Sequence, residues 1–330
     1  GFVPGQYRAH LVTKQWQTAD MLQLSLKVSP RWPGFVSGQH LLLTLYHNGR
    51  YISRPFSICS PLSLWQSHRH IQLCCKISSA GEFTPLLNLL NKGAVVNISP
   101  AQGDFYWQQP AMPAVFVAAG SGITPIAAML LSQRHWLAPA TLHYRVRGTE
   151  NAALLKELKQ LADMQPLFTL LLSDSRTEPA ETLQQQLCAS LSNQQFYLCG
   201  PQAFMQQLRT TLNQHGVPAE HIKHEQFGFA LPPAANIKSS TTEPLLSANF
   251  IRAGISTAVT LNSQHSLLQS AEQHNLAPRF GCRMGVCFQC VCDKVSGQVR
   301  DIRSGALSGH GAEQIQLCIS QPVTELVIKL

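Results

Sequence analysis

The stretch GCRMGVCFQC, at residues 281–290, is the most informative part of this chain, together with Cys318 further on. Cys282, Cys287 and Cys290 follow the spacing C-x4-C-x2-C. Thiolates in this pattern, with a fourth from elsewhere, hold a plant-type [2Fe–2S] cluster. Gly281 and Gly285 supply the backbone freedom that a loop around a cluster needs. We therefore predict that Cys282, Cys287, Cys290 and Cys318 are the iron ligands.

Two other metal centres fit these cysteines less well. A structural zinc site usually combines two C-x2-C pairs, whereas the loop has one. A Rieske centre needs two histidine ligands, and the loop has none. Cys292 lies outside the spacing and is expected to be a buried thiol. The chain has ten cysteines in 330 residues, which suits a reducing compartment better than a disulfide framework.

The blocks of sequence around this loop differ in how their apolar residues and turn residues are spaced. Residues 245–330 form a small block, with strands expected at 247–252, 257–261 and 325–329 and a helix at 266–274. Residues 232–244 are rich in Pro, Ser and Thr and poor in large apolar residues, so we expect a linker there.

The middle block, residues 111–231, alternates apolar runs with helical stretches. This pattern predicts a parallel sheet with right-handed crossovers. The expected strands are 114–118, 141–146, 167–172, 195–199 and 222–227, and the expected helices are 125–136, 151–162, 180–191 and 201–215.

The first block, residues 1–110, has short alternating segments separated by turn residues. Such segments are typical of an antiparallel barrel or sandwich. The expected strands are 22–28, 40–46, 56–59, 70–77 and 94–99, with one helix at 84–90.

Two motifs in the first block suit a flavin. In RPFS, residues 54–57, the Arg54 guanidinium can bind phosphate, the Phe56 ring can pack on the flavin, and the Ser57 hydroxyl can reach its N5. Alone, RPFS also fits an ordinary strand end. In GEFTPLL, residues 81–87, Thr84 is expected to be the N-cap of a helix whose free N–H groups can bind phosphate. A plain capped helix is the alternative.

The middle block has a nucleotide motif. AVFVAAGSGITP, residues 114–125, predicts a strand, a tight turn at Gly120 and Gly122, and a helix that begins near Thr124 and Pro125. Such a turn lets the backbone and the helix N-terminus approach a pyrophosphate.

These motifs and their order resemble the ferredoxin–NADP reductase superfamily, in the branch with a C-terminal plant-type ferredoxin domain. The resemblance covers nearly the whole chain. It implies a multidomain fold: an antiparallel β-barrel flavin domain at 1–110, an α/β parallel-sheet NAD(P)-binding domain at 111–231, a linker at 232–244 and a β-grasp (α+β) ferredoxin domain at 245–330.

The resemblance also implies roles for single residues. Phe56 stands where the family's flavin motif has tyrosine, and the match of Gly81 and Thr84 to the pyrophosphate motif favours FAD over FMN. Cys199 and Gly200 match the segment beside the nicotinamide, which makes Ser57, Cys199 and Glu225 the candidate catalytic residues. Phe227 is expected to cover the flavin ring.

The end of the third strand of the middle block bears on the coenzyme. Ser175 and Arg176 resemble the pair that binds a ribose 2′-phosphate, which favours NADPH over NADH. Arg145 and Arg147 can add positive charge. Asp174 would repel the phosphate if its side chain pointed inward.

The implied function is an NAD(P)H-dependent oxidoreductase that passes electrons from FAD through the cluster to a partner protein. We expect a di-iron fatty-acid desaturase or oxygenase as partner. The alternatives are a non-catalytic flavin and iron–sulfur subunit of another dehydrogenase and a reductase of a hybrid-cluster protein.

The composition also bears on the class of protein. The net charge is +8 and 45% of the residues are hydrophobic, which suits a globular protein. No dense basic run interleaved with aromatic residues points to nucleic acid. No apolar run approaches the ~20 residues that cross a bilayer, and no signal-peptide pattern is seen. We therefore expect a cytoplasmic monomer, with a membrane-bound partner and a peripheral position at the membrane as further options.

Overall fold

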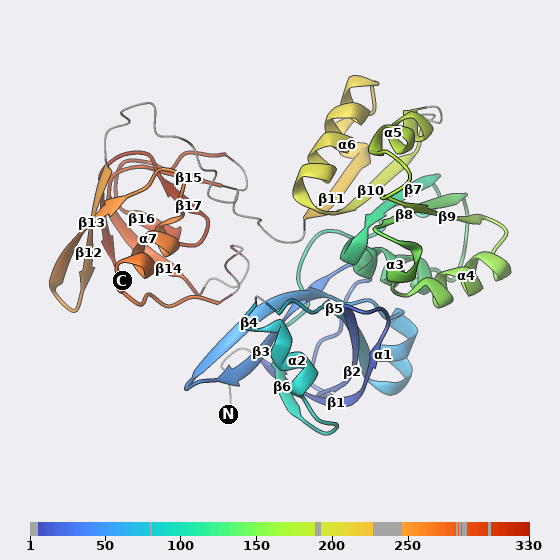
Figure 1. Cartoon of the computed structure of the whole chain (residues 1–330), viewed down its shortest axis with the longest axis horizontal. Coiled ribbons are helices and arrows are strands. Elements are labelled where there is room, and N and C mark those ends of the chain that lie inside the picture. The colour runs from blue at the N-terminus through green and yellow to red at the C-terminus, as the bar shows by residue number, and fades with distance from the viewer. Residues whose placement is uncertain are drawn as a thin grey trace. The chain divides into compact units, whose positions relative to one another are not determined.

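The computed structural model describes residues 6–79, 81–188, 193–226, 246–281, 283, 285, 289–302 and 305–330, without the side chains of Arg50 and Gln226. The chain separates into two compact units, Gly1–Phe229 and Ala230–Leu330. The described residues form four sheets, two of them in the first unit, and Figure 1 labels their strands. The predicted linker at 232–244 lies outside the described residues.

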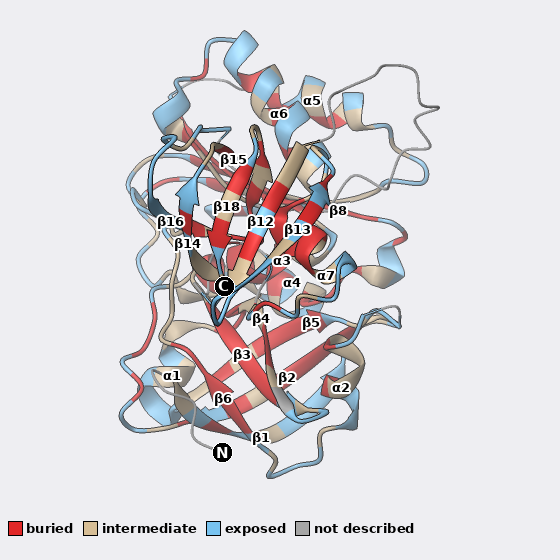
Figure 2. Cartoon of the chain, turned by 90° about the vertical axis from the view of Figure 1, so that its left-hand side faces the viewer, coloured by how far each residue is buried: buried red, intermediate tan, exposed pale blue. Residues whose placement is uncertain are grey.

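The first sheet is antiparallel, with the order β4-β3-β6-β1-β2-β5. A bridge between Ile58 and Leu73 joins its two edges, so the sheet closes into a barrel. Figure 2 shows the buried residues along its strands. The strands are β1 (Tyr7–Trp16), β2 (Met21–Val28), β3 (His40–His47), β4 (Arg50–Ser57), β5 (His70–Lys76) and β6 (Val95–Ile98), and the helices are α1 (Leu62–His68) and α2 (Thr84–Leu89).

The first block departs from the sequence prediction in four places. Strand β1 and helix α1 were not predicted, and β4 runs from Arg50 to Ser57 rather than over 56–59. Thr84 is not an N-cap. The cap position is Phe83, and the Thr84 Oγ1 instead accepts the N–H of Ser78 at 3.0 Å and donates to its carbonyl at 3.3 Å. The Thr84 hydroxyl therefore closes the loop before the helix.

The second sheet is parallel, with the order β11-β10-β7-β8-β9, as the middle block predicts. Its strands are β7 (Ala114–Ala119), β8 (Ala140–Val146), β9 (Phe168–Asp174), β10 (Gln195–Gly200) and β11 (Ile222–Gln226). Its helices are α3 (Ile123–Ser132), α4 (Leu155–Met164), α5 (Ala180–Cys188) and α6 (Gln202–Gln214), with short 3-10 turns η1 (Gly120–Gly122), η2 (Thr149–Asn151) and η3 (Ala219–His221).

Alternate residues of the parallel strands bury against different helices, as a strand's two-residue period requires. Phe116 and Leu142 share a core with Ile126 of α3 and Leu158 of α4. Val115 and Val117 share another with α5 and α6, through side chains that include Leu183 and Leu208. Because all parallel strands end at one edge of the sheet, the segments that follow β7, β8, β9 and β10 gather along that edge.

The second unit has a mixed sheet in the order β13-β12-β18-β14-β16, in which only β12 and β18 pair in parallel. Its strands are β12 (Leu246–Arg252), β13 (Ile255–Leu261), β14 (Val291–Ser296), β16 (Glu313–Gln316) and β18 (Leu326–Lys329), and β15 (Val299–Asp301) pairs with β17 (Ser320–Pro322). Ser266 caps helix α7 (Leu267–Gln273) in a reciprocal capping box with Gln269.

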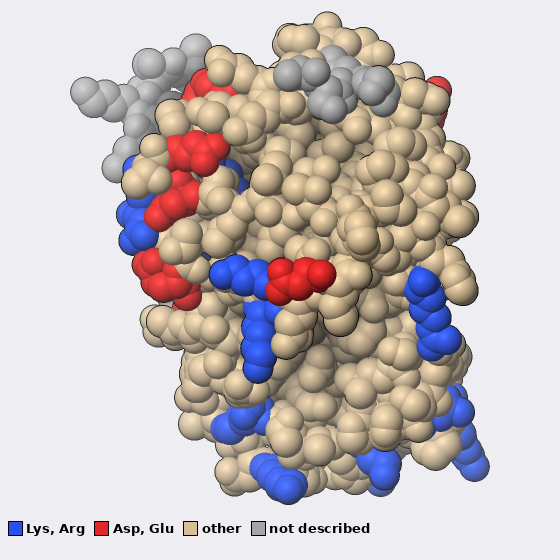
Figure 3. All heavy atoms as spheres, turned by 90° about the vertical axis from the view of Figure 1, so that its right-hand side faces the viewer, with Lys and Arg blue, Asp and Glu red and all other residues tan. Residues whose placement is uncertain are grey.

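Charge is spread over the surface. On the face in Figure 3, Lys and Arg side chains lie scattered among uncharged residues rather than in one continuous patch. One lysine is buried instead: Lys294 Nζ donates to the carbonyls of Gly297, Gly309 and Gly311 and lies 3.1 Å from Glu313 Oε1. Among the described residues, no helix is both long and apolar enough to cross a bilayer.

Candidate functional site

The carboxylate of Glu225, near the end of β11, joins the barrel to the parallel sheet. Its Oε1 lies 3.2 Å from His40 Nδ1, and its Oε2 accepts a 3.4 Å hydrogen bond from Ser57 Oγ. His40 and Ser57 are direct partners in the β3–β4 register, so one pair of barrel strands supplies both contacts. We call these three residues the Glu225 cluster.

The Glu225 cluster is largely shielded from water. The side chains of His40 and Glu225 are 14% and 15% exposed, and Ser57 is buried. In the contact with Glu225, His40 Nδ1 donates in the tautomer that carries the proton on Nδ1. His40 Nε2 is buried with no hydrogen-bond partner among the described residues. His40 is a residue that sequence reasoning missed, because its partner Glu225 is 185 positions away.

Cys199 lies beside Glu225 in the parallel register of β10 and β11. Burial raises the pKa of its thiol well above the ordinary value, and the Glu225 carboxylate raises it further. The thiol therefore stays protonated near neutral pH and is a poor nucleophile. Of the three candidate catalytic residues, Ser57 and Glu225 are hydrogen-bonded, and Cys199 is next to Glu225.

The predicted glycine turn packs directly onto the segment at Cys199 and Gly200. A Cβ at Gly122 would lie 2.1 Å from the Cys199 carbonyl oxygen, and one at Gly200 would lie 2.8 Å from the Ala119 Cβ. Gly120 has a φ of +55° and no atom within 4 Å of its ideal Cβ, so its backbone borders open space. These contacts bring the ends of β7 and β10 together beside the Glu225 cluster.

Helix α3 begins one residue before the predicted Thr124. Thr124 and Pro125 are both buried in its first turn, and Thr124 Oγ1 donates to the Ser121 carbonyl at 3.0 Å. The hydroxyl thus fixes the turn from within. The N–H groups of this turn remain the candidate contacts for a pyrophosphate.

The candidate flavin residues of the barrel lie near one another. Phe56 and Phe83 have ring centroids 5.9 Å apart, and the Arg54 guanidinium carbon lies 5.9 Å from the Phe83 ring centroid. Arg54 and Phe56 are half-buried, in line with Ser57 on the same strand. A cation, an aromatic face and a hydroxyl on one strand are the groups that a flavin with a phosphate tail requires.

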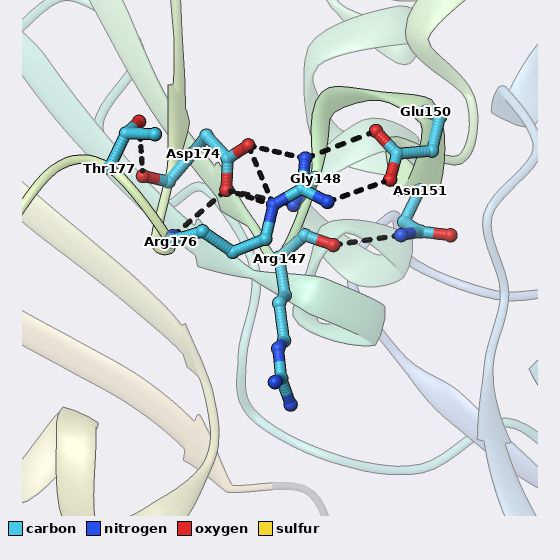
Figure 4. A network of polar contacts seen from close by, with 7 residues as sticks. All are labelled: Arg147, Gly148, Glu150, Asn151, Asp174, Arg176 and Thr177. Carbon is cyan, nitrogen blue, oxygen red and sulfur yellow. Dashed lines mark hydrogen bonds and ion pairs between the residues drawn. The ribbon is translucent and has the colours of Figure 1, made fainter.

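At the other end of the parallel sheet, Arg176 lies between two carboxylates (Figure 4). Arg176 Nη2 is 2.7 Å from Asp174 Oδ2, and Arg176 Nη1 is 3.1 Å from Glu150 Oε1. The Arg176 guanidinium holds the pKa of Asp174 well below its usual range. We call these three residues the Arg176 network.

The other predicted coenzyme residues surround this network. Ser175 is exposed, and its N–H donates to the Val146 carbonyl at 2.7 Å. The Arg147 side chain extends away from the network (Figure 4). Arg145 is buried; its Nη2 donates to the Glu178 carbonyl, while its Nη1 has no hydrogen-bond partner among the described residues.

The structure describes half of the predicted iron ligands. Cys290 and Cys318 are buried in the core of the second unit, and the Gly285 N–H donates to Cys318 Sγ at 3.3 Å. A backbone N–H directed at a cysteine sulfur is the contact that stabilises a thiolate on iron. Cys282, Cys287 and Phe227 lie outside the described residues. Cys292 is partly exposed.

Three family models match consecutive parts of the chain. An oxidoreductase FAD-binding domain matches residues 8–107, and a 2Fe-2S iron-sulfur cluster binding domain matches residues 252–323. The N-terminal domain of dimethylamine monooxygenase subunit DmmA-like proteins matches residues 96–222. The expected FAD and [2Fe–2S] cofactors are thereby confirmed.

Relatives of similar length align with most of this chain. An NADPH oxidoreductase of Mycobacterium tuberculosis is 27% identical over 98% of this chain and 84% of its own length. The carnitine monooxygenase reductase subunit of Acinetobacter pittii is 24% identical over 88% and 90%. The solved structure of phthalate dioxygenase reductase, 23% identical, covers 99% of this chain and 98% of its own with a TM-score of 0.68, which confirms the fold.

Proposed function

We infer that this chain, which belongs to the family of ferredoxin-reductase-like FAD-binding oxidoreductases with a C-terminal 2Fe-2S domain, is the reductase component of a multicomponent oxygenase system. It takes electrons from NAD(P)H and delivers them through FAD and the cluster to a partner protein. The proposal rests on this chain's own site as well as on its relatives.

The observation that carries the proposal is the position of Glu225. Its carboxylate is bound by Ser57 from the candidate flavin strand and lies beside Cys199 from the candidate coenzyme strand. A reaction between a flavin and a nicotinamide needs groups from both strands at one place. The Glu225 cluster supplies them in a largely water-excluded setting.

Each residue has a proposed task. When bound, the flavin accepts a hydride and the cluster carries single electrons. The Ser57 hydroxyl orients the flavin edge, the protonated Cys199 thiol packs against the nicotinamide, and Glu225 holds Ser57 and His40 in place through its hydrogen bonds. Arg54, Phe56, Gly81 and Thr84 are proposed to bind FAD; Gly120, Gly122, Thr124, Pro125, Gly200 and Phe227 complete the nucleotide and flavin contacts.

The proposed partner is an oxygenase, because several relatives are named as reductases of monooxygenase or demethylase systems. A di-iron fatty-acid desaturase is the finer proposal from the sequence, and a membrane-bound partner goes with it. We also propose that the protein acts as a monomer in the cytoplasm. Sedimentation of the purified protein tests the oligomeric state.

An anaerobic titration of the purified, cofactor-loaded protein with NADPH and NADH in parallel tests the reductase function. Flavin and cluster absorbance should both bleach at a low concentration of one nucleotide. A better response to NADH would contradict the 2′-phosphate role of Ser175 and Arg176. No bleaching with either nucleotide would overturn the reductase function in favour of a subunit that receives electrons from another enzyme.

A further inference from the structure

We propose that Glu150 sets the choice between NADPH and NADH, because its carboxylate occupies the side of Arg176 that a ribose 2′-phosphate would bind. The inference rests on the proposed use of NAD(P)H and adds a residue that the sequence motif does not contain. Glu150 lies in η2, after β8, whereas Arg176 follows β9.

The position fits the adenosine end of a dinucleotide. Strands β7, β8 and β9 are parallel neighbours, and ligands of open α/β sheets bind outside the carboxyl ends of such strands. The glycine turn follows β7, Glu150 follows β8, and Arg176 follows β9. A nucleotide whose pyrophosphate lies at the glycine turn therefore extends its ribose toward the Arg176 network.

Most of the hydrogen-bonding capacity of Arg176 is already used. Its Nε and Nη2 donate to Asp174, at 3.1 and 2.7 Å from Oδ2. Its Nη1 and Nη2 donate to Glu150, at 3.1 Å from Oε1 and 3.4 Å from Oε2. Guanidinium groups bind phosphate oxygens through these same paired donors, so a phosphate and Glu150 compete for one edge of the group.

The two carboxylates differ in how firmly they are held. Asp174 Oδ1 also accepts the N–H groups of Gly148 and Arg176, each at 2.9 Å, and its side chain is 15% exposed. The Glu150 side chain is 63% exposed, and within the described part of the chain its carboxylate forms polar contacts with the Arg176 guanidinium alone. Asp174 therefore anchors Arg176, and Glu150 is the exchangeable partner.

Gly148 leaves the space in which Glu150 and Arg176 meet. Its φ is +87°, and a Cβ there would lie 2.2 Å from Glu150 Oε1 and 2.7 Å from Arg176 Nη2. The turn after β8 thus brings Glu150 against the guanidinium, and a side chain at Gly148 would move them.

The charges give the direction of the effect. Two carboxylates around one guanidinium leave a net negative charge, which repels a 2′-phosphate dianion. A 2′-hydroxyl is neutral and can donate to a carboxylate, as in NAD-binding folds with an acidic residue at the ribose. Glu150 therefore weakens NADPH binding relative to NADH, whichever coenzyme the native protein prefers.

The test is Glu150→Gln, which keeps the shape of the side chain and removes its charge. In the cofactor-loaded protein, the ratio of kcat/KM for NADPH over NADH should rise about fivefold at low salt, and less at high salt. The affinity for 2′,5′-ADP, measured by calorimetry, should rise by a similar factor relative to that for 5′-AMP. If neither the kcat/KM ratio nor the ratio of affinities for 2′,5′-ADP and 5′-AMP changed, the inference would be overturned.

Two further variants separate the possible causes. Glu220→Gln removes an exposed carboxylate in η3, before β11 at the opposite edge of the sheet, and should leave the ratio as it is. In an Arg176→Gln background, Glu150→Gln should lose most of its effect, because there is no guanidinium left to release. A full effect in that background would show that Glu150 acts by general repulsion and not through Arg176. Failure of both nucleotides to reduce the unaltered protein would instead refute the proposed function.

Discussion

The Glu225 cluster and the Arg176 network are both built around a carboxylate, yet they differ in origin and surroundings. The Glu225 cluster joins residues 185 and 168 positions apart, and the Glu225 side chain is 15% exposed. The Arg176 network joins residues within 26 positions, and Glu150 and Arg176 are 63% and 49% exposed.

This difference separates two tasks. In the buried cluster, little water competes for the hydrogen bonds, so a change of one group affects the orientation of the others. Around the exposed Glu150 and Arg176, water and salt screen the charges, so single contributions there are small and adjustable, whereas Asp174 is as shielded as Glu225. We therefore expect the Glu225 cluster to set the geometry of the reaction and the Arg176 network to set the preference between coenzymes.

Matched carboxylate-to-amide substitutions give the largest expected contrast. Glu225→Gln should lower the rate of flavin reduction by about 100-fold with either coenzyme, because it replaces one of the two oxygens that face His40 and Ser57 with an NH2 group that donates. Asp174→Asn should act mainly on KM, by less than about tenfold. Anaerobic stopped-flow absorbance at several coenzyme concentrations measures both effects.

Similar rate losses in Glu225→Gln and Asp174→Asn would contradict the division of tasks between the Glu225 cluster and the Arg176 network. Flavin content and thermal unfolding of each variant serve as controls, since Glu225 is partly buried and its amide could disturb packing. A Glu225→Gln protein with normal flavin content and a normal rate would remove Glu225 from the proposed reaction site.

The sequence predicted part of each region and missed one residue in each. Ser57, Glu225 and Arg176 lie in local motifs, so each was found without knowledge of its contacts. His40 begins an apolar strand and resembles any polar residue at a strand end, and nothing local points to Glu225. Glu150 lies in a polar turn after β8, where a carboxylate is ordinary. The contacts of His40 and Glu150 depend on how the strands are arranged in the folded chain, so the sequence did not predict them.

The fold shows the same limit. Strands β7, β8 and β10 were predicted closely, and β7, with the sequence AVFVAA, shows the continuous apolar run that a parallel strand buried on both faces gives. Strand β1, with the sequence YRAHLVTKQW, was missed because only Ala9 and Leu11 are buried in it. Helix α1 is seven residues long, and Leu62 and Trp65 are only partly buried on the barrel core, so its apolar pattern is too short to predict a helix.

A second, smaller effect is expected at His40. His40→Leu removes the donor to Glu225 and should slow flavin reduction about tenfold. His40→Asn places an amide N–H near the position of Nδ1 and should restore most of the rate. The ratio of the two variants, measured by stopped flow with saturating coenzyme, isolates the hydrogen bond from the loss of packing.

Equal losses in the two His40 variants would contradict the donor role and point to packing or to the unpaired Nε2. That outcome would also weaken the contrast with the Arg176 network, because the Glu225 cluster would then act by packing the barrel against the sheet and not by hydrogen bonding. A rate that His40→Leu leaves unchanged would reduce the cluster to Ser57 and Glu225.

The last effect is on stability rather than on rate and concerns His143 on β8, a histidine whose pKa is shifted by burial and not by a carboxylate. Burial lowers the pKa of His143 to about 4. The unfolded chain therefore takes up a proton near pH 6.5 that the folded chain resists, so stability falls as pH drops from about 6.5 toward 4. His143→Gln should remove this dependence and gain about 1–2 kcal/mol relative to the unaltered protein between pH 7 and pH 5.

Urea unfolding of the cofactor-loaded protein at the two pH values measures that gain, with the exposed His10→Gln as the matched control. A gain as large in the control would assign the pH dependence to unfolded-state charge rather than to burial. No gain at His143 would mean that the folded sheet accepts the proton there. Burial would then not be enough to make His143 differ from an exposed histidine. The hydrogen bonds of the Glu225 cluster would then owe their effect to the pairing of its groups and not to burial.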